Sequence, residues 1–235
     1  VQRIREAERD LIYAEFVEKQ GEIITGIISK KEGSNIIVDL GKTEGLLPFS
    51  EQVPTENYRI GGRMKFYIVE VKKTSKGSRI VLSRTHPGLV KRLFELEVPE
   101  VHDGLVDIKA IAREPGVRSK VVVESRSDKI DPVGSCIGNR GSRVKNITDE
   151  LRGEKIDIIR WSNDPRLLIA EALSPARVVK VELDEETDTA RVFVPEDQLS
   201  LAIGKDGQNA RLAARVTSWR IDIKGEKDIG QEDSH

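Results

Sequence analysis

The stretch Cys136-Ile137-Gly138-Asn139-Arg140-Gly141-Ser142-Arg143-Val144 decides the fold, because a second version follows as Ala202-Ile203-Gly204-Lys205-Asp206-Gly207-Gln208-Asn209-Ala210. Each copy contains Ile-Gly-x-x-Gly and runs into a helix-like segment, 143–151 in the first copy and 208–216 in the second. Glycines lack a Cβ atom, so the backbone can approach a sugar-phosphate chain closely. The free N–H groups of the following helix favour an anion. The repeat therefore predicts two phosphate-binding loops.

The segments around the two loops also match. Each copy has a helix-like segment and two strand-like segments before the loop, and a further strand-like segment after the helix. The resulting order of helix, strand, strand, helix, Gly-x-x-Gly, helix, strand resembles the type II KH domain, which binds single-stranded RNA and whose loop holds about four nucleotides. The corresponding segments are 89–94 and 167–172, 105–110 and 176–182, 120–124 and 191–194, and 156–159 and 220–223.

Charge distinguishes the two loops. Between positions 132 and 148 the only charged residues are Arg140, Arg143 and Lys145, so the first loop is positive although the chain has a net charge of −1. In the second loop Lys205 is offset by Asp206. Charge reversal is therefore expected to weaken the first loop more.

We expect the RNA contacts to come from the loops and from the helix starts. In the second copy the backbone amides and Gln208 or Asn209 must supply more of the binding. The turn at 113–120 either adds basic contacts or is simply a solvated turn, and the sequence leaves both open. The predicted contact residues are Gly138, Asn139, Arg140, Gly141, Ser142, Arg143, Lys145, Gly204, Lys205, Asp206, Gly207, Gln208, Asn209, Arg211, Arg118 and Lys120.

Two other interpretations of the glycines are weaker. A single Gly-x-x-Gly also serves as an ordinary helix-to-helix turn, but two copies in matched surroundings argue against that. Gly134, Gly138 and Gly141 could suggest a dinucleotide site. Such a site needs a strand that runs directly into the glycines, whereas here the strand-like segment ends at 124 and Pro132 intervenes.

The front of the chain has a different texture, with short strand-like runs separated by turns that contain Gly, Asn and Ser. This pattern predicts an OB-type barrel. The phrase Glu44-Gly45-Leu46-Leu47-Pro48-Phe49-Ser50-Glu51 resembles the RNA-binding OB domain repeated in the largest small-subunit ribosomal protein. The five runs are 22–29, 35–40, 44–47, 64–71 and 79–83.

The second of these runs departs from that resemblance. Such domains often carry an aromatic pair there for base stacking, whereas this chain has Asn35, Ile36 and Ile37. Base stacking on this strand should therefore be poor. The remaining aromatic candidates, each of which could equally be a core residue, are Phe49, Phe66 and Tyr67.

The whole chain is predicted to be multidomain, an all-β OB barrel and two α/β KH domains behind a connector helix. The charged segment 2–19 carries the narrow apolar stripe Ile4, Leu11 and Val17. We expect it to connect domains or to pack on a neighbour, and a solvated surface helix is the alternative. Four residues at 162–165 join the KH domains, which should hold the two loops in fixed relation along one RNA track. The predicted domains are 1–20 connector helix, 21–86 OB barrel, 87–162 first KH, 163–225 second KH and 226–235 acidic tail.

Composition limits the possible functions. The chain has 235 residues, 34% charged and 4% aromatic, which suits several small domains. One cysteine cannot form an internal disulfide, and no signal peptide or long apolar span is seen, so we expect a cytoplasmic protein without membrane association. Cys136 is expected to be a small buried residue, because no motif pairs a histidine with it. We expect no catalytic residue, metal or cofactor.

The domain order, together with several phrases, resembles the NusA family of bacterial transcription elongation and termination factors. The resemblance implies a non-enzymatic RNA-binding part that acts in pausing, termination and antitermination, a monomer with RNA polymerase and other elongation factors as partners. In that family a polymerase-binding domain precedes the connector helix, and we expect it to be missing here. The phrases are 3–9, 113–116, 153–159 and 202–213.

Two alternatives share these modules: an RNA-binding subunit of a nuclease or exosome-like assembly, and a ribosome-associated protein. Against a nuclease stand the missing cluster of carboxylates or histidines and the order of OB before KH.

Overall fold

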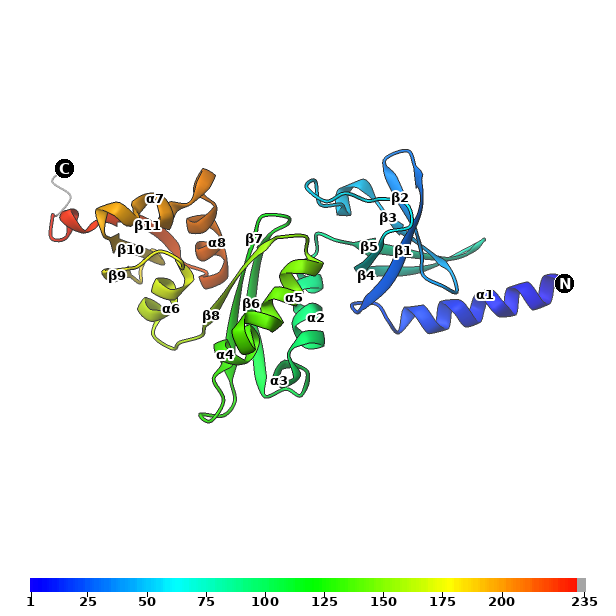
Figure 1. The fold of residues 1–235 in the computed structure, drawn as a ribbon, viewed down its shortest axis with the longest axis horizontal. Coiled ribbons are helices and arrows are strands. Elements are labelled where there is room, and N and C mark those ends of the chain that lie inside the picture. Colours follow the sequence, from blue (N-terminus) through cyan, green and yellow to red (C-terminus); the bar gives the residue numbers. More distant parts are fainter. Residues whose placement is uncertain (232–235) are drawn as a thin grey trace. The chain divides into compact units, whose positions relative to one another are not determined.

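The computed structural model describes residues 1–231. The last four residues of the predicted tail therefore lie outside the described part. The chain forms two compact units: residues 1–97 with 146–153, here called the barrel unit, and residues 98–145 with those from 154 onward, here called the two-sheet unit. Figure 1 shows the elements of both.

The barrel unit contains the predicted OB barrel. Its five strands close in the order β1-β2-β3-β5-β4. Side chains that alternate along the strands fill the interior, and Val38, Phe66 and Leu82 are completely buried. A short 3-10 turn, η1, spans Phe49–Glu51. The strands are β1 Ile23–Glu32, β2 Asn35–Asp39, β3 Glu44–Leu47, β4 Arg63–Thr74 and β5 Gly77–Ser83.

Helix α1 (Gln2–Val17) packs on the barrel with its last turns only. Phe16 is 2% exposed and joins the barrel core, with Ile12, Tyr13 and Val17 beside it. The predicted stripe was wrong for Ile4 and Leu11, which are 65% and 70% exposed. Every residue from 1 to 11 is exposed, because the helix buries side chains against the barrel only in its last turns. In its middle, the exposed Asp10 pairs with Lys73 of β4 at 2.8 Å.

A buried arginine joins the end of the barrel to the end of α5. Arg84 is fully buried, pairs with Glu56, and donates from Nη2 to the Glu150 carbonyl at 2.8 Å. Its Nη1 donates to Glu150 Oε1 at 3.1 Å. Burial raises the cost of leaving such a charge unpaired, so this network holds residues 146–153 in the barrel unit. Helix α2 (Pro87–Glu97) belongs to the same unit.

The two-sheet unit repeats one topology. Its sheets have the orders β6-β7-β8 and β11-β10-β9. In each sheet the middle strand pairs with one antiparallel and one parallel neighbour, which confirms the two predicted KH domains. The strands are β6 Val106–Glu114, β7 Arg118–Ser125, β8 Lys155–Arg160, β9 Lys180–Asp184, β10 Thr189–Val194 and β11 Arg220–Gly225.

Around the two glycine loops the helices also match: α4 and α7 precede the loops, and α5 and α8 follow them (Figure 1). Two segments differ from prediction. The strand predicted at 176–182 begins only at Lys180, because the Ala176 amide bonds the Leu173 carbonyl in a turn. The predicted tail begins with a 3-10 turn, η5 (Glu226–Asp228), whose Lys227 amide bonds Glu196. The helices are α3 Pro99–His102, α4 Pro132–Ile137, α5 Ser142–Glu150, α6 Pro165–Ala172, α7 Leu199–Ile203 and α8 Gln208–Thr217.

The two sheets share a core. Helix α8 of the second copy contacts β6 and β7 of the first, and Val122 and Ile159 belong to one buried cluster with Leu212 and Val216. Burial of this apolar surface stabilises the arrangement. Both glycine loops therefore belong to one compact unit, and a shared core joins the two copies in addition to the short joint. That the joint holds the loops in fixed relation along one RNA track stays a prediction.

Candidate nucleic-acid interface

The two glycine loops have the same backbone conformation. In each loop the second glycine amide donates to the carbonyl of the first at 3.1 Å, in 3-10 turns at Asn139–Gly141 (η2) and Lys205–Gly207 (η4). The sequence repeat is thus a structural repeat. The φ angles are +77° at Gly138 and Gly204, +53° and +54° at Arg140 and Asp206, and +75° at Gly141 and Gly207.

The first glycine of each loop is required by its surroundings. With φ of +77° and ψ of 174° and 169°, Gly138 and Gly204 adopt a conformation that other residues avoid. A Cβ atom on Gly204 would lie 2.8 Å from the Asn209 amide nitrogen, and one on Gly138 would lie 2.6 Å from Arg143 Cγ. The glycines therefore bring each loop against the start of the next helix.

The first loop presents Asn139 and Arg140 to solvent. Arg143, predicted as a free phosphate contact, is held by Glu100: its Nη1 donates to Glu100 Oε2 at 2.7 Å and to the Ser135 carbonyl at 2.7 Å. Glu100 lies in α3, more than thirty residues before the first loop. The positive strip is thus partly neutralised through space. Ser142 and Lys145 are exposed on α5.

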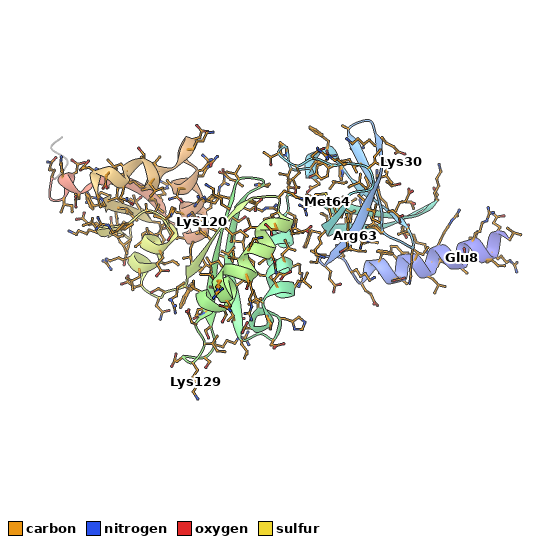
Figure 2. The ribbon with its side chains drawn as sticks, in the orientation of Figure 1. Glu8, Lys30, Arg63, Met64, Lys120 and Lys129 are labelled. Atoms are coloured by element: carbon orange, nitrogen blue, oxygen red, sulfur yellow. The ribbon has the colours of Figure 1, made fainter. Side chains whose placement is uncertain are left out.

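A groove of about 580 Å³ borders the first loop. It carries the acids Glu100 and Asp131 together with Lys129, which Figure 2 shows at the tip of the loop between β7 and α4, pointing away from the protein. Opposite charges along the groove make it weakly suited to an anion. Its lining residues are Glu100, Leu105, Lys129, Ile130, Asp131, Gly134, Ser135, Gly138, Asn139 and Arg143.

The second loop presents Lys205, Asp206 and partly Gln208. Lys205 is exposed and has no carboxylate within ion-pair distance among residues 1–231. Arg211 is not free: its Nε donates to Glu114 Oε1 at 2.6 Å and its Nη1 to the Asp206 carbonyl at 3.1 Å. Because Glu114 ends β6 of the first copy, this pair ties the two copies together.

The prediction that Asn209 contacts RNA was wrong. Its side chain is 4% exposed, and its Nδ2 donates to the carbonyls of Leu173 and Ala202 at 2.9 and 3.0 Å. Asn209 thus links the end of α6, helix α7 and the start of α8. It shapes the loop from inside the protein.

Lys120 was also wrongly predicted to face RNA or solvent. It is fully buried, and its Nζ donates to Asp157 Oδ2 at 2.8 Å and to the Ser174 carbonyl at 2.9 Å. Burial lowers the pKa of Lys120, opposed by the Asp157 carboxylate. Parallel pairing of β7 with β8 places the two residues opposite each other. Figure 2 labels Lys120 within the two-sheet unit.

Arg118 stays at the surface but is restrained. Its Nη1 donates to both Asp157 oxygens, at 3.1 and 2.8 Å, and its side chain is 18% exposed. The preceding turn is fixed by the buried Glu154 carboxylate, which accepts from Gly116 N at 2.7 Å and pairs with Arg113. The turn at 113–120 is therefore rigid.

A second cavity, of about 310 Å³, lies between the second loop and this turn. We call it the junction cleft, because both KH copies line it. Sequence reasoning missed Lys155, the first residue of β8, which only tertiary structure brings to the second loop. The lining residues are Val117, Arg118, Lys155, Pro175, Ser200, Leu201, Gly204, Lys205, Gln208 and Asn209.

The three aromatic candidates in the barrel differ in how exposed they are. Phe66 is fully buried in the core, and Tyr67 stacks on His86 with ring centroids 4.3 Å apart. Only Phe49 of the three stacking candidates is strongly exposed, at 68%.

Cys136 is fully buried, as expected, and desolvation raises the pKa of its thiol to about 12. Such a thiol is almost entirely protonated at neutral pH. Within residues 1–231 no group of three or more His, Cys, Asp or Glu could hold a metal ion. Among the same residues, no helix combines the length and apolar character needed to cross a membrane.

Three family models match consecutive parts of the chain. Residues 18–84 match the S1 RNA binding domain, residues 84–161 the NusA-like first KH domain, and residues 165–231 the NusA-like second KH domain. The match to an S1 domain followed by two KH domains agrees with the barrel and the two repeated sheets.

Curated relatives are similar over nearly the whole chain. A Halalkalibacterium halodurans protein is 59% identical over 227 residues, which cover 97% of this chain and 59% of the relative. A Bacillus subtilis protein is 56% identical, covering 97% and 61%. A Mycobacterium tuberculosis protein is 50% identical, covering 96% and 68%. Each is called transcription termination/antitermination protein NusA. The chain thus spans 59% and 61% of the length of the first two relatives.

Proposed function

We propose that this chain, which belongs to the NusA family of transcription termination/antitermination proteins, binds single-stranded nascent RNA and thereby modulates pausing, termination and antitermination. The observation that carries the proposal is the pair of glycine loops, with matching φ angles, inside one compact unit. Each KH loop holds about four nucleotides, so the two together suit an RNA of about eight to eleven.

The proposed action is binding without catalysis. We propose RNA polymerase and other elongation factors as partners, as membership of the NusA family implies; the relatives' names place them in transcription termination and antitermination. We further propose that the chain acts as a monomer in the cytoplasm, where its single buried thiol needs no disulfide partner.

Charge reversal in the loops tests RNA binding. Replacing Asn139 and Arg140 together by Asp sets negative charge against the phosphates but leaves both glycines in place. Loss of charge-assisted contacts should cost about 1–3 kcal/mol of binding free energy. The comparison variant is Lys205→Asp, which should cost less. Fluorescence anisotropy with a labelled 11-nucleotide RNA measures affinity, and thermal unfolding checks the fold.

A 5-nucleotide RNA and a hairpin that sequesters the same sequence serve as controls. Both should bind more weakly, because the two loops need an extended single strand. A first-loop variant that unfolds and binds RNA like the wild type would show that the loop is only a turn.

A further inference from the structure

We propose that the junction cleft holds one nucleotide of the RNA that spans the two loops, with its phosphate between Lys155 and Lys205. This inference rests on the proposed function and deepens it, because it names a binding position outside either Gly-x-x-Gly motif. The lining side chains come from both copies, so the position exists only where the copies meet.

The walls of the cleft are fixed before any ligand arrives. On one side Lys120 Nζ bonds the Ser174 carbonyl, next to Pro175. On the other side Arg211 joins Glu114 to the Asp206 carbonyl. A preformed site avoids the entropy cost of ordering its groups on binding.

The charges favour an anion. Lys155 and Lys205 are both exposed, and neither has an ion-pair partner among the residues that the structure describes. Arg118 adds a third cation, already satisfied by Asp157. A phosphate that enters between the two lysines therefore displaces no carboxylate, and it gains charge-assisted contacts.

The remaining lining suits a base. Val117 and Leu201 are 36% and 43% exposed, and Pro175 is also exposed. Together they offer apolar surface of the kind that binds an unstacked base. Asn209 lies behind this surface and is 4% exposed, so it supports the cleft wall and does not face the base. The volume of about 310 Å³ lies at the lower end of the range for small-ligand sites, which limits the cleft to one nucleotide.

The groove at the first loop lacks this character. Positions Gly134, Ser135, Gly138, Asn139 and Arg143 correspond to Ser200, Leu201, Gly204, Lys205 and Asn209 of the junction cleft. In the first groove Glu100 and Asp131 stand beside the cations. A nucleotide phosphate there would meet two carboxylates.

Lys155→Gln tests the cleft without touching either loop. An 11-nucleotide RNA selected from a random pool by the wild-type protein is the probe. The variant should bind about fivefold more weakly, and the slope of log affinity against log salt should fall by about 0.7, the value for one phosphate on a single strand. The matched control is Lys227→Gln, which removes an exposed lysine outside the cleft in the same unit and should bind like the wild type.

A neutral methylphosphonate placed at each RNA position in turn then locates the phosphate. At one RNA position the methylphosphonate should weaken binding to the wild-type protein. The same substitution should not weaken binding to Lys155→Gln further, because that variant already lacks the contact between Lys155 and the phosphate. If Lys155→Gln binds like the wild type while the Asn139→Asp, Arg140→Asp variant loses RNA, the cleft is not used although RNA binding stands. If the loop variant also binds normally, the proposed function fails, and this inference fails with it.

Discussion

The two glycine loops share a backbone but differ in what surrounds them. The clearest example is the position two residues after the second glycine of each loop. It is Arg143 in the first copy and Asn209 in the second. Arg143 is partly exposed and paired with Glu100. Asn209 is buried and bonds two carbonyls. One position therefore tunes surface charge in the first copy and holds the loop together in the second.

This difference shows that charge along the sequence is a poor guide to charge in space. The first loop has no acid nearby in sequence, yet Glu100 reaches it from α3. The second loop is nearly neutral in sequence, yet Lys155 joins Lys205 at the junction cleft. The expected advantage of the first loop for anions is therefore smaller than the sequence suggests.

The largest expected effect comes from the first glycine of each loop. Gly204→Ala adds backbone strain and places a methyl group 2.8 Å from the rigid Asn209 amide nitrogen. Gly138→Ala adds the same strain, but its methyl group meets Arg143 Cγ, which can move. We expect a loss of about 3 kcal/mol for Gly204→Ala and about 1–2 kcal/mol for Gly138→Ala. Hydrogen exchange of α8 and of α5 measures the two costs separately. Equal losses of unfolding free energy in the two variants would mean that backbone strain, and not the steric contact of the added methyl group, sets the cost.

A smaller effect is expected at Arg143 and Asn209. Asn209→Ala removes the donor from two buried carbonyls and should cost about 2 kcal/mol of unfolding free energy. Arg143→Ala breaks a pair whose arginine side chain is 31% exposed and should cost below about 1 kcal/mol. RNA affinity should respond the other way, falling for Arg143→Ala only. Urea unfolding and anisotropy at low temperature check both, and a stable Asn209→Ala protein that binds poorly would make Asn209 a contact residue after all.

Most of the fold could be predicted, because local patterns determine it. The repeat around Gly138 and Gly204 requires two similar units, and β-branched runs mark the strands. The predictions failed where tertiary contacts override pattern. The apolar spacing of Ile4 and Leu11 suggested a contact face, but α1 adds side chains to the barrel core only in its last turns, chiefly through Phe16.

The site could be predicted less completely. The loops themselves are local, so their glycines and exposed residues follow from the sequence. The predictions for Lys120 and Asn209 failed because a polar residue within a motif can be buried and can hydrogen-bond inside the protein. Lys120 stands in a β-branched run opposite Asp157, and a lone charge within such a run is a signal of burial. Nothing in the sequence links Lys155 to Lys205.

The smallest expected effect tests the charge difference between the loops directly. Glu100→Gln removes the carboxylate that neutralises Arg143 and keeps a side chain of similar shape. RNA affinity should rise about twofold to threefold, because a partly exposed pair is screened by solvent and is worth below about 1 kcal/mol. The salt slope should steepen by about 0.7 as one more cation becomes available to a phosphate.

The matched control for this change is Glu124→Gln, which removes a partly exposed carboxylate paired with Lys109 on the same sheet and away from both loops. It changes net charge equally, so a gain shared by both variants would reflect the overall charge of the protein. A gain confined to Glu100→Gln would show that this glutamate limits the first loop. If affinity falls instead, Glu100 must act by holding Arg143 in position. The first loop would then need its acid to bind RNA, as the second needs Asn209 to keep its shape.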